Sequence, residues 1–571
     1  MTIPIRHGPS HSDSEISWKN SYPPEVPLHM EYRKITISRL LQETSEKYPH
    51  HRAISFMGFR MTYRELWNDV CRFANALVHM GVKPGDAICI MLPNCPQTVT
   101  AFYGALLAGA VVVMTNPLYV ERELQYQLQD SGAKVIIVLD LLDQRVMRAI
   151  EQTKIEQVVF TGIQDYLVFP KNLIYSVKMH LQGKKPAITY NSKVHRWKEI
   201  LEKGSIEAYH PSTNVDDVAL LQYTGGTTGT PKGVMLSHWN INANTQQLVA
   251  WFYKCEFGNE RILCVLPFFH VYGLTIGMNL AVAVGAEMIL LPRFDGDKIL
   301  QTIDRERPTM FPGTPTMYIS IINHPKVSHY DLSSVKACLS GAAGLPVEVQ
   351  QSFEKLTGGR LVEGYGLTEA SPVTHCIPIW HKRKSGSIGL PLPDTEVKII
   401  DLETGEPIID GRVGELIVKG PQVMKGYWNR PDETKEVLRD GWLYTGDLSL
   451  MDDEGFFYIV DRKKDLIIAG GYNIYPREVE EVLYEHPSIQ EAVVLGVPDP
   501  YRGETVKAYI VLKEGKQPSL DEIEVYCRSK LASYKIPRTI EFRTELPKTI
   551  SGKILRRRLL EEGNEAAASK A

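Results

Sequence analysis

The chain has 571 residues. A chain of this length is too long to fold around a single hydrophobic core, so we expect at least two domains. Hydrophobic residues make up 43% of the sequence and charged residues 23%, a composition that is typical of globular proteins. The 64 Lys and Arg residues against 67 Asp and Glu residues give a formal net charge of −3, which excludes the overall basic surplus that nucleic-acid-binding proteins usually carry.

Short apolar runs that are typical of strands alternate with helical stretches in the first part of the chain. Residues 1–34 are polar and contain prolines, so we expect a loose N-terminal arm there. An amphipathic helix is predicted from about residue 37 and a buried helix over 98–110. Strands are predicted over 86–93, 111–116 and 134–140. Strands and helices that alternate at this spacing indicate an α/β fold with mostly parallel strands.

The segment 165–194 interrupts this alternation, because it mixes large apolar residues with Lys171, Lys178, Lys184 and Lys185. A helix in this segment would be basic and amphipathic, which suits a contact with the interface of a membrane. Amphipathic helices also commonly cover a protein core, so a surface helix with solvated lysines is the alternative. The sequence leaves both interpretations open.

The eight cysteines are scattered and form neither a C-x-x-C pair nor a spacing with histidine that is typical of zinc ligands. Most lie in apolar runs, so we interpret them as reduced, buried thiols of a cytoplasmic protein. The N-terminal segment lacks the apolar stretch of a secretory signal, and the C-terminal residues carry no lipidation signal. The apolar stretch 262–291 is interrupted by Pro267, His270 and Glu287, which favours strand, loop, helix and strand over a membrane-spanning helix.

The region 388–459 is rich in glycine and in strand-like runs, which predicts a small, mainly β subdomain. After it comes the charged sequence DRKKD, where we place the boundary between two domains. The residues beyond read as helix, strand, strand and helix, which predicts a small α+β domain. The predicted organisation is an arm over 1–34, a large domain over 35–460, a hinge over 461–465 and a C-terminal domain over 466–571.

The phosphate loop, which we define as YTGGTTGTPKG over residues 223–233, follows the apolar run DVALLQ. Glycines let the backbone approach an anion closely, while threonine hydroxyls and Lys232 add hydrogen-bond donors and a positive charge. The loop is not a Walker A motif, because Pro precedes the lysine and Gly follows it. We expect it to wrap a polyphosphate, with candidate contacts at Thr224, Gly225, Gly226, Thr227, Thr228, Gly229, Thr230 and Lys232.

With this loop, the sequence resembles the adenylate-forming superfamily of acyl-CoA synthetases, luciferases and peptide-synthetase adenylation domains from about residue 38 to about residue 560. Within it, the segments MLPNCPQTV, TNPLY and GWLYTGD are most similar to bacterial long-chain fatty acid–CoA ligases. The resemblance implies an α/β fold with two α/β subdomains and a small β-barrel in a large N-terminal region, followed by a small mobile α+β domain. It also implies ATP, Mg²⁺ and CoA as cofactors.

Forming an acyl-adenylate requires a carboxylate to attack the α-phosphate of ATP. A carboxylic acid is already ionised at neutral pH, so positioning and charge neutralisation, rather than a general base, should carry this step. The resemblance assigns Tyr365, in YGLTE, to stacking on adenine, Thr368 to the α-phosphate and Glu369 to Mg²⁺, for which a carboxylate is a suitable hard ligand. The other nucleotide contacts that it implies are Asp447 at the ribose, Arg462, Gly366, and Gly341, Ala342 and Ala343 in SGAAGL. It also implies that Lys553 reaches the acyl carboxylate and that Thr228 is a second metal ligand.

The second step transfers the acyl group to the thiol of CoA. The resemblance implies that the C-terminal domain rotates about Lys464 between the steps, and that Gly470 and Gly471 then line a channel for the pantetheine arm. Glycine is what such a close backbone approach requires. The alternative for these two glycines is an ordinary turn before a helix that begins near Pro476.

The acid is expected to be a long-chain or medium-chain fatty acid. His270, in PFFHVYGL, resembles the residue that borders the acyl pocket in the family, and this segment has no acidic residue to pair with an amino-acid substrate. The mostly apolar run 275–291 suits a long hydrophobic tunnel, since each buried methylene contributes about 0.8 kcal/mol. Gly273 and Leu274 stand where long-chain members often carry an aromatic gate, which leaves the range of chain lengths open.

Other functions stay in view as alternatives. An aryl-acid or coumarate-type CoA ligase would use the same two steps, and a carrier protein in place of CoA is a further alternative acceptor. A non-catalytic nucleotide- or acyl-binding scaffold is disfavoured, because Glu369, Asp447 and Lys553 are all present. No nucleic-acid partner is expected, and the oligomeric state is open, with a homodimer as one alternative.

Overall fold

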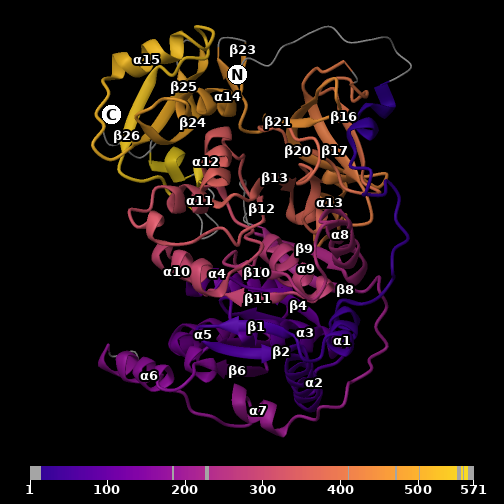
Figure 1. Cartoon of the computed structure of the whole chain (residues 1–571). Coiled ribbons are helices and arrows are strands. Elements are labelled where there is room, and N and C mark those ends of the chain that lie inside the picture. Colours follow the sequence, from indigo (N-terminus) through magenta and orange to yellow (C-terminus); the bar gives the residue numbers. More distant parts are fainter. Residues whose placement is uncertain are drawn as a thin grey trace.

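The computed structural model describes residues 14–182, 186–224, 231–408, 410–469, 472–499, 502–548, 554–556 and 558–562. The chain forms a large N-terminal region and a smaller C-terminal domain, which is drawn in yellow and lies at one end of the molecule in Figure 1. This arrangement confirms the predicted α/β fold class. None of the helices in the described ranges is both long and apolar enough to cross a membrane.

The largest sheet among the described residues has the strand order β18-β9-β8-β4-β3-β5-β6-β7. Its strands are β3 (Ala87–Met91), β4 (Val111–Met114), β5 (Val135–Leu139), β6 (Gln157–Thr161), β7 (Val194–Arg196), β8 (Val218–Thr224), β9 (Lys232–Ser237) and β18 (Gly426–Tyr427). The strands from β8 through β4, β3, β5 and β6 to β7 pair in parallel, and their apolar runs are buried, as expected for strands covered on both faces. These pairings confirm the parallel strands predicted near residues 86–140.

This part of the chain also contains the helices α1 (Ile37–Lys47), α2 (Tyr63–His79), α3 (Pro96–Leu107), α4 (Glu121–Ser131), α5 (Asp143–Ala149), α6 (Lys171–Leu181), α7 (Trp197–Lys203) and α8 (His238–Trp251). Of these, α3, α7 and α8 contact strands of the sheet, and α4 and α5 share a buried apolar cluster with it. The hydroxyls of Thr36 and Thr62 accept hydrogen bonds from the first turns of α1 and α2, which fixes where these helices begin. All of α3 is buried, in agreement with the buried helix predicted there.

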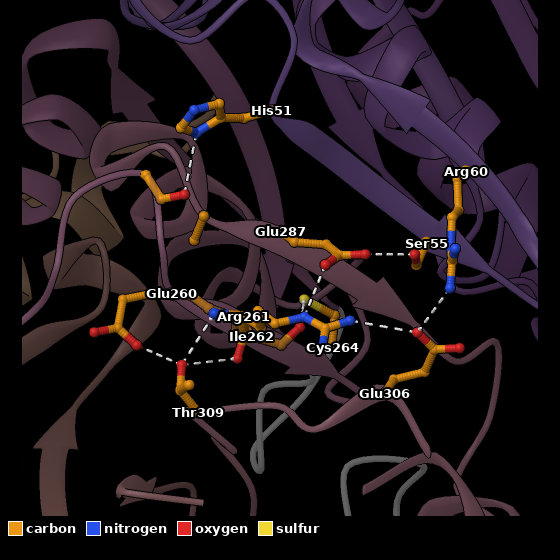
Figure 2. A network of polar contacts seen from close by, with 12 residues as sticks. His51, Ser55, Arg60, Glu260, Arg261, Ile262, Cys264, Glu287, Glu306 and Thr309 are labelled. Carbon is orange, nitrogen blue, oxygen red and sulfur yellow. Dashed lines mark hydrogen bonds and ion pairs between the residues drawn. The ribbon is translucent and has the colours of Figure 1, made fainter. Parts of the chain in front are cut away.

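A second sheet has the order β10-β11-β1-β2, with β1 (Arg52–Phe56), β2 (Phe59–Thr62), β10 (Arg261–Cys264) and β11 (Glu287–Leu290). Between β10 and β11 lie a π-helix (Gly273–Asn279) and α9 (Leu280–Val284), which confirms the predicted order of strand, loop, helix and strand. Figure 2 shows the polar network that joins these strands, in which the Arg261 guanidinium donates to Glu287 at 2.8 Å and to Glu306 at 3.3 Å. The hydroxyl of Ser55 on β1 donates to the same Glu287 carboxylate at 2.5 Å.

The rest of the N-terminal region carries two smaller sheets. One has the order β12-β13-β14-β15, with β12 (Ala337–Ser340), β13 (Arg360–Gly366), β14 (Val373–Cys376) and β15 (Leu390–Pro391). The other is antiparallel and contains β16 (Glu396–Ile400), β17 (Gly414–Lys419), β19 (Leu438–Arg439), β20 (Trp442–Met451) and β21 (Phe457–Arg462). Near them lie α10 (Gly296–Glu306), α11 (Pro315–Ile322), α12 (Val347–Thr357) and α13 (Pro431–Val437). The strand-rich segment predicted over 388–459 is therefore confirmed.

The C-terminal domain has its own sheet and its own core. Its elements are β22 (Ile467–Ala469), β23 (Tyr472–Ile474), α14 (Pro476–Tyr484), β24 (Ile489–Asp499), β25 (Gly503–Leu512), α15 (Leu520–Arg528) and β26 (Thr539–Arg543). Val479, Val494 and Ile510 are buried in a cluster that α14, β24 and β25 share. The succession α14, β24, β25 and α15 matches the predicted helix, strand, strand and helix.

The N-terminal arm is not loose where the structure describes it. Tyr22 is buried, packs edge-to-face against Trp251 at 5.3 Å and donates a hydrogen bond to the carbonyl oxygen of Pro391 at 3.0 Å. Val26 is buried as well. These apolar side chains, which stand singly among polar neighbours, hold the arm against the N-terminal region. The eight cysteines are all free and mostly buried, as predicted.

Candidate active site

The phosphate loop joins β8 to β9. Thr224, the last residue of β8, is the register partner of Lys232, the first residue of β9, so the two strands form an antiparallel hairpin. The predicted contacts Gly225, Gly226, Thr227, Thr228, Gly229 and Thr230 lie outside the described residues. The structure thus places both ends of the predicted phosphate-binding segment next to each other.

Lys232 is held by neighbours from a distant part of the chain. Its ammonium forms an ion pair with Glu433 and lies 5.1 Å from the centre of the Tyr427 ring. The hydroxyl of the same Tyr427 donates a hydrogen bond of 2.8 Å to the carboxylate of Glu369. Tyr427 therefore brings the base of the phosphate loop next to the carboxylate that was predicted to bind Mg²⁺.

Glu369 lies just beyond β13, in the short turn Thr368–Ala370. Its main-chain oxygen accepts a hydrogen bond from the amide of Met424 at 2.8 Å, which ties this turn to the segment before β18. Among the described residues, no group of three or more His, Cys, Asp or Glu side chains is placed to hold a metal ion. Mg²⁺ usually takes one or two carboxylates from a protein and the rest of its ligands from phosphates and water, so a single Glu369 fits this ion. Thr228, the second candidate ligand, lies outside the described residues.

Tyr365, Asp447 and Arg462 come together from three strands. The Tyr365 hydroxyl donates to the Asp447 carboxylate at 2.5 Å, and the Arg462 guanidinium lies 3.4 Å from the other oxygen of that carboxylate. Asp447 on β20 and Arg462 on β21 are register partners. Burial, and then the neighbouring Asp447 carboxylate, raise the pKa of Tyr365 well above its usual range, so the phenol stays protonated and donates. A carboxylate held in this way can accept the two hydroxyls of a ribose.

Gly366 follows Tyr365 at a point where the backbone is crowded. A Cβ atom at this position would lie 1.9 Å from the carbonyl oxygen of Pro372, so only glycine fits. This close approach belongs to the tight connection between β13 and β14 that carries Thr368 and Glu369. Gly366 is therefore a structural neighbour of the side chains that were predicted to bind the nucleotide.

The segment with Gly341, Ala342 and Ala343 follows β12 and ends against a carboxylate. Ala342 has a positive φ of 69°, which marks a sharp turn in the backbone. The amide of Leu345 donates to Glu363 on β13 at 2.8 Å, and the guanidinium of Arg477 on α14 lies 3.9 Å from the same carboxylate. The ion pair between Arg477 and Glu363 therefore joins the C-terminal domain to the N-terminal region.

His270 lies half-buried in the loop that leaves β10. The side chain of Asn94 holds this loop, since its amide donates to the carbonyl oxygens of Cys264 at 3.0 Å and Leu266 at 2.9 Å and its oxygen accepts the amide of Phe268 at 2.8 Å. The side chain of Gln222 on β8 donates to the carbonyl oxygen of Phe269 at 2.8 Å. The loop with His270 is thus fixed to the strand that leads into the phosphate loop.

Gly273 begins the π-helix after His270. A Cβ atom there would lie 2.4 Å from the carbonyl oxygen of Pro267, so this position is packed against backbone. The residues that follow in the π-helix and α9 are buried, in agreement with an apolar region beside His270. Sequence reasoning did not find Asn94 or Gln222, although Asn94 lies in the MLPNCPQTV segment that was noted for its resemblance.

Lys464 lies in the connection between β21 and β22. Partial burial, and then the nearby Arg462 guanidinium, lower the pKa of its ammonium group. Lys464 thus stands between the last strand of the N-terminal region and the first strand of the C-terminal domain. Gly470, Gly471 and Lys553 lie outside the described residues.

Two comparisons of sequence identify the relatives of the chain. A family model for AMP-binding enzymes matches residues 41–428, and a model for the C-terminal domain of AMP-binding enzymes matches residues 478–553. The long-chain-fatty-acid–CoA ligase of Bacillus subtilis (strain 168) is 54% identical over 559 residues, which cover 97% of this chain and 99% of that protein. The protein of the same name from Escherichia coli O157:H7 is 39% identical, with 97% and 99% covered.

Solved structures have the same fold. An anthranilate CoA ligase in complex with anthranoyl-AMP superposes with a TM-score of 0.84 at 27% identity, covering 95% of this chain and 99% of that chain. ATP-bound MatB from Rhodopseudomonas palustris superposes with a TM-score of 0.81 at 28% identity, covering 92% and 99%. These matches confirm the resemblance that was drawn from the motifs. The chain belongs to the AMP-binding enzyme family.

Proposed function

We propose that the protein is an AMP-forming long-chain fatty acid–CoA ligase. In the first step, a carboxylate oxygen of the fatty acid bonds to the α-phosphorus of ATP, and pyrophosphate leaves. In the second step, the sulfur of CoA bonds to the acyl carbon, its proton is lost, and AMP leaves. The observation that supports this best is the Tyr365–Asp447–Arg462 cluster, whose oriented carboxylate suits the hydroxyls of a ribose, in a chain that is 54% identical to a long-chain-fatty-acid–CoA ligase.

The first step needs orientation and charge neutralisation, because its nucleophile is already ionised. Asp447 accepts the ribose hydroxyls, and Tyr365 fixes the Asp447 carboxylate and offers its ring to the adenine. Thr368 and the phosphate loop with Lys232 bind the phosphates, and Lys553 reaches the acyl carboxylate. Glu369, with Thr228, would hold Mg²⁺, which would neutralise the negative charge of the phosphates.

The second step needs access for a thiol to the carbonyl carbon. We assign Lys464 as the hinge at which the C-terminal domain changes its position, and Gly470 and Gly471 as the residues that line the pantetheine channel. The position of Lys464 between β21 and β22 supports a hinge role, since a change in its backbone angles would move every element from β22 onwards. ATP, Mg²⁺ and CoA are then the full cofactor set.

The fatty acid is assigned from the relatives and from the apolar residues beyond His270. The π-helix (Gly273–Asn279) and α9 are buried almost throughout, and an acyl chain would gain about 0.8 kcal/mol for each methylene it buries there. The anthranilate CoA ligase among the structural neighbours is the reason to keep an aryl acid in the test. At 27% identity, it supports that alternative less than the 54% relative supports a fatty acid.

The test is pyrophosphate release with ATP, Mg²⁺ and a series of acids from acetate to oleate together with coumarate, each with and without CoA. We expect release to rise with chain length and an acyl-CoA thioester to form when CoA is present. Reaction with coumarate or short acids alone would replace the fatty acid by an aryl or short-chain acid. Absence of release with every acid would contradict the ligase assignment.

We further propose that the protein works in the cytoplasm and contacts a membrane through α6. This helix lies at the periphery of the N-terminal region (Figure 1). Its inner side is half-buried, and Tyr175 there packs against the core. The outer side carries a single stripe of large apolar side chains at helical spacing, whose exposed fractions are 56% for Leu173, 62% for Ile174, 58% for Val177 and 80% for Leu181.

The charge around α6 specifies the kind of membrane. Between residues 166 and 198 the sequence contains Lys and Arg but no Asp or Glu, in a chain with a net charge of −3. Lys171 and Lys178 border the apolar stripe on one side. An apolar stripe with basic residues beside it binds the interface of bilayers that contain anionic lipid.

Vesicle sedimentation tests this contact. We expect the protein to sediment with vesicles of phosphatidylcholine and phosphatidylglycerol, less so in high salt, and the double variant Leu173→Asn/Val177→Asn to stay in the supernatant. The matched control is Leu118→Asn/Val525→Asn, which removes two apolar side chains of 67% and 66% exposure away from α6. Equal sedimentation of the wild type and both variants would contradict the proposal.

A further inference from the structure

A buried carboxylate lies behind the phosphate loop and belongs to none of the sequence motifs. Asp130 stands near the end of α4, and its side chain is only 10% exposed. One carboxylate oxygen accepts the hydroxyl of Tyr223 at 2.7 Å, and the other accepts the guanidinium of Arg430 at 3.0 Å. The main-chain oxygen of Asp130 accepts the indole N–H of Trp428 at 3.1 Å.

These contacts hold the two ends of the phosphate loop. Tyr223 is the first residue of the loop, so its bond to Asp130 fixes the entry. At the exit, the hydroxyl of Tyr126 on α4 donates to the carbonyl oxygen of Pro231 at 3.0 Å, and Arg430 donates to that same hydroxyl at 3.4 Å. The amide of Trp428 donates to the carbonyl oxygen of Gly233 at 2.7 Å.

The chemistry of this cluster makes the carboxylate hard to replace. Hydrogen bonds to an ionised group are shorter and stronger than neutral ones, and the Arg430–Asp130 pair is one of these. Burial, and then the bond to Asp130, raise the pKa of Tyr223, so its hydroxyl remains a donor. Removal of the negative charge would leave the Arg430 guanidinium next to a neutral group and would weaken the acceptor of the Tyr223 hydroxyl.

We propose that Asp130 is a positioning residue, which fixes both ends of the phosphate loop and so sets the alignment of ATP for adenylate formation. The inference rests on the proposed function, because it concerns the step that consumes ATP. Asp130 lies behind the hairpin and acts through Tyr223, Arg430 and Tyr126 rather than through contact with the substrates. The rate of adenylate formation should fall when the ends of such a loop shift by about an ångström, because the bound ATP then shifts relative to the attacking carboxylate.

The test separates the two half-reactions in the variant Asp130→Asn, which keeps the size of the side chain. We expect the KM for ATP in pyrophosphate release to rise and kcat to fall, with kcat/KM lower by on the order of 10-fold to 100-fold. Thioester formation from supplied oleoyl-adenylate and CoA uses no triphosphate, so its rate should stay within about twofold of the wild type. Tyr126→Phe, which removes the bond to Pro231 and the longer one from Arg430 but keeps the Asp130 carboxylate, should show the same pattern more weakly.

The matched control is Asp69→Asn on α2. Asp69 forms an ion pair with Arg72, one turn along the same helix, at the same 3.0 Å distance, and its side chain is 17% exposed. We expect this variant to keep the wild-type KM for ATP. The inference is overturned if Asp130→Asn and Tyr126→Phe both keep wild-type kcat/KM for ATP, or if both half-reactions fall together. Failure of the ligase assignment would appear differently, as a wild type that releases no pyrophosphate with any acid.

Discussion

Glu363 provides a test of how burial and charge compete at the contact between the domains. Its carboxylate is buried on β13, where it accepts the amide of Leu345 at 2.8 Å and lies 3.9 Å from the Arg477 guanidinium. Burial raises the pKa of Glu363 from 4.5 to about 7, although Arg477 and the Leu345 amide oppose this rise. The distance to Arg477 explains why the cation does not offset the loss of water.

The variant Glu363→Gln removes the ionisation and keeps the shape. A carboxyl with a raised pKa in the folded state binds its proton more tightly there than in the unfolded chain. Its contribution to stability is therefore complete below pH 4.5 and is lost as the pH rises through about 7. At about 1.4 kcal/mol for each pKa unit, the rise from 4.5 to about 7 corresponds to about 3 kcal/mol.

We therefore expect Glu363→Gln to gain stability relative to the wild type between pH 5 and pH 8, by up to about 3 kcal/mol. Urea unfolding followed by tryptophan fluorescence at several pH values measures this difference. Glu354→Gln is the control, because Glu354 on α12 is bonded to Arg383 at 2.6 Å, and its loss should bring no such gain. A stability difference for Glu363→Gln that stays constant, or falls with rising pH, would refute the reasoning.

Three further predictions concern single side chains of the candidate site. Tyr365→Phe removes the hydrogen bond that orients Asp447, so the KM for ATP at saturating oleate should rise by about 10-fold, and an unchanged KM would argue against the ribose assignment. Glu369→Gln should raise the Mg²⁺ concentration for half-maximal pyrophosphate release by about 10-fold or more, whereas an unaltered Mg²⁺ titration would place the ion elsewhere. Asn94→Ala leaves the main-chain groups of Cys264, Leu266 and Phe268 without their partner and should cost about 3 kcal/mol or more in urea unfolding. A loss below about 1 kcal/mol would mean that the loop with His270 finds other partners.

The strands of the central sheet could be predicted because their signal is local. Runs such as AICIM and VIIVL are apolar at every position, and such runs occur in parallel strands that are covered on both faces. The N-terminal arm was predicted to be loose because it contains no such continuous apolar run. Its few anchors, such as Tyr22 and Val26, are separated by polar residues and show no periodicity that would reveal a packed face.

The candidate site was predictable in its members but not in its contacts. YGLTE and YTGD are distinctive enough to be identified by resemblance, yet neither shows that Tyr365 donates to Asp447 across 82 residues of sequence. Asp130 was missed altogether, since an aspartate near the end of a polar helix is ordinary in sequence. Its partners Tyr223 and Arg430 lie 93 and 300 residues away, and such distances leave no local pattern.

The segment 426–430 shows why these contacts matter together. Its first two residues form β18, an antiparallel strand beside β9, so that a piece of chain between β17 and β19 of the small sheet completes the sheet that carries the phosphate loop. In this short stretch, Tyr427 contacts both Lys232 and Glu369, and Arg430 contacts Asp130. A change that moves this segment would therefore disturb the lysine, the carboxylate that we propose for Mg²⁺ and the support of the loop at once. The ATP-dependent step should accordingly be more sensitive to substitutions in this strand than the transfer of the acyl group to CoA.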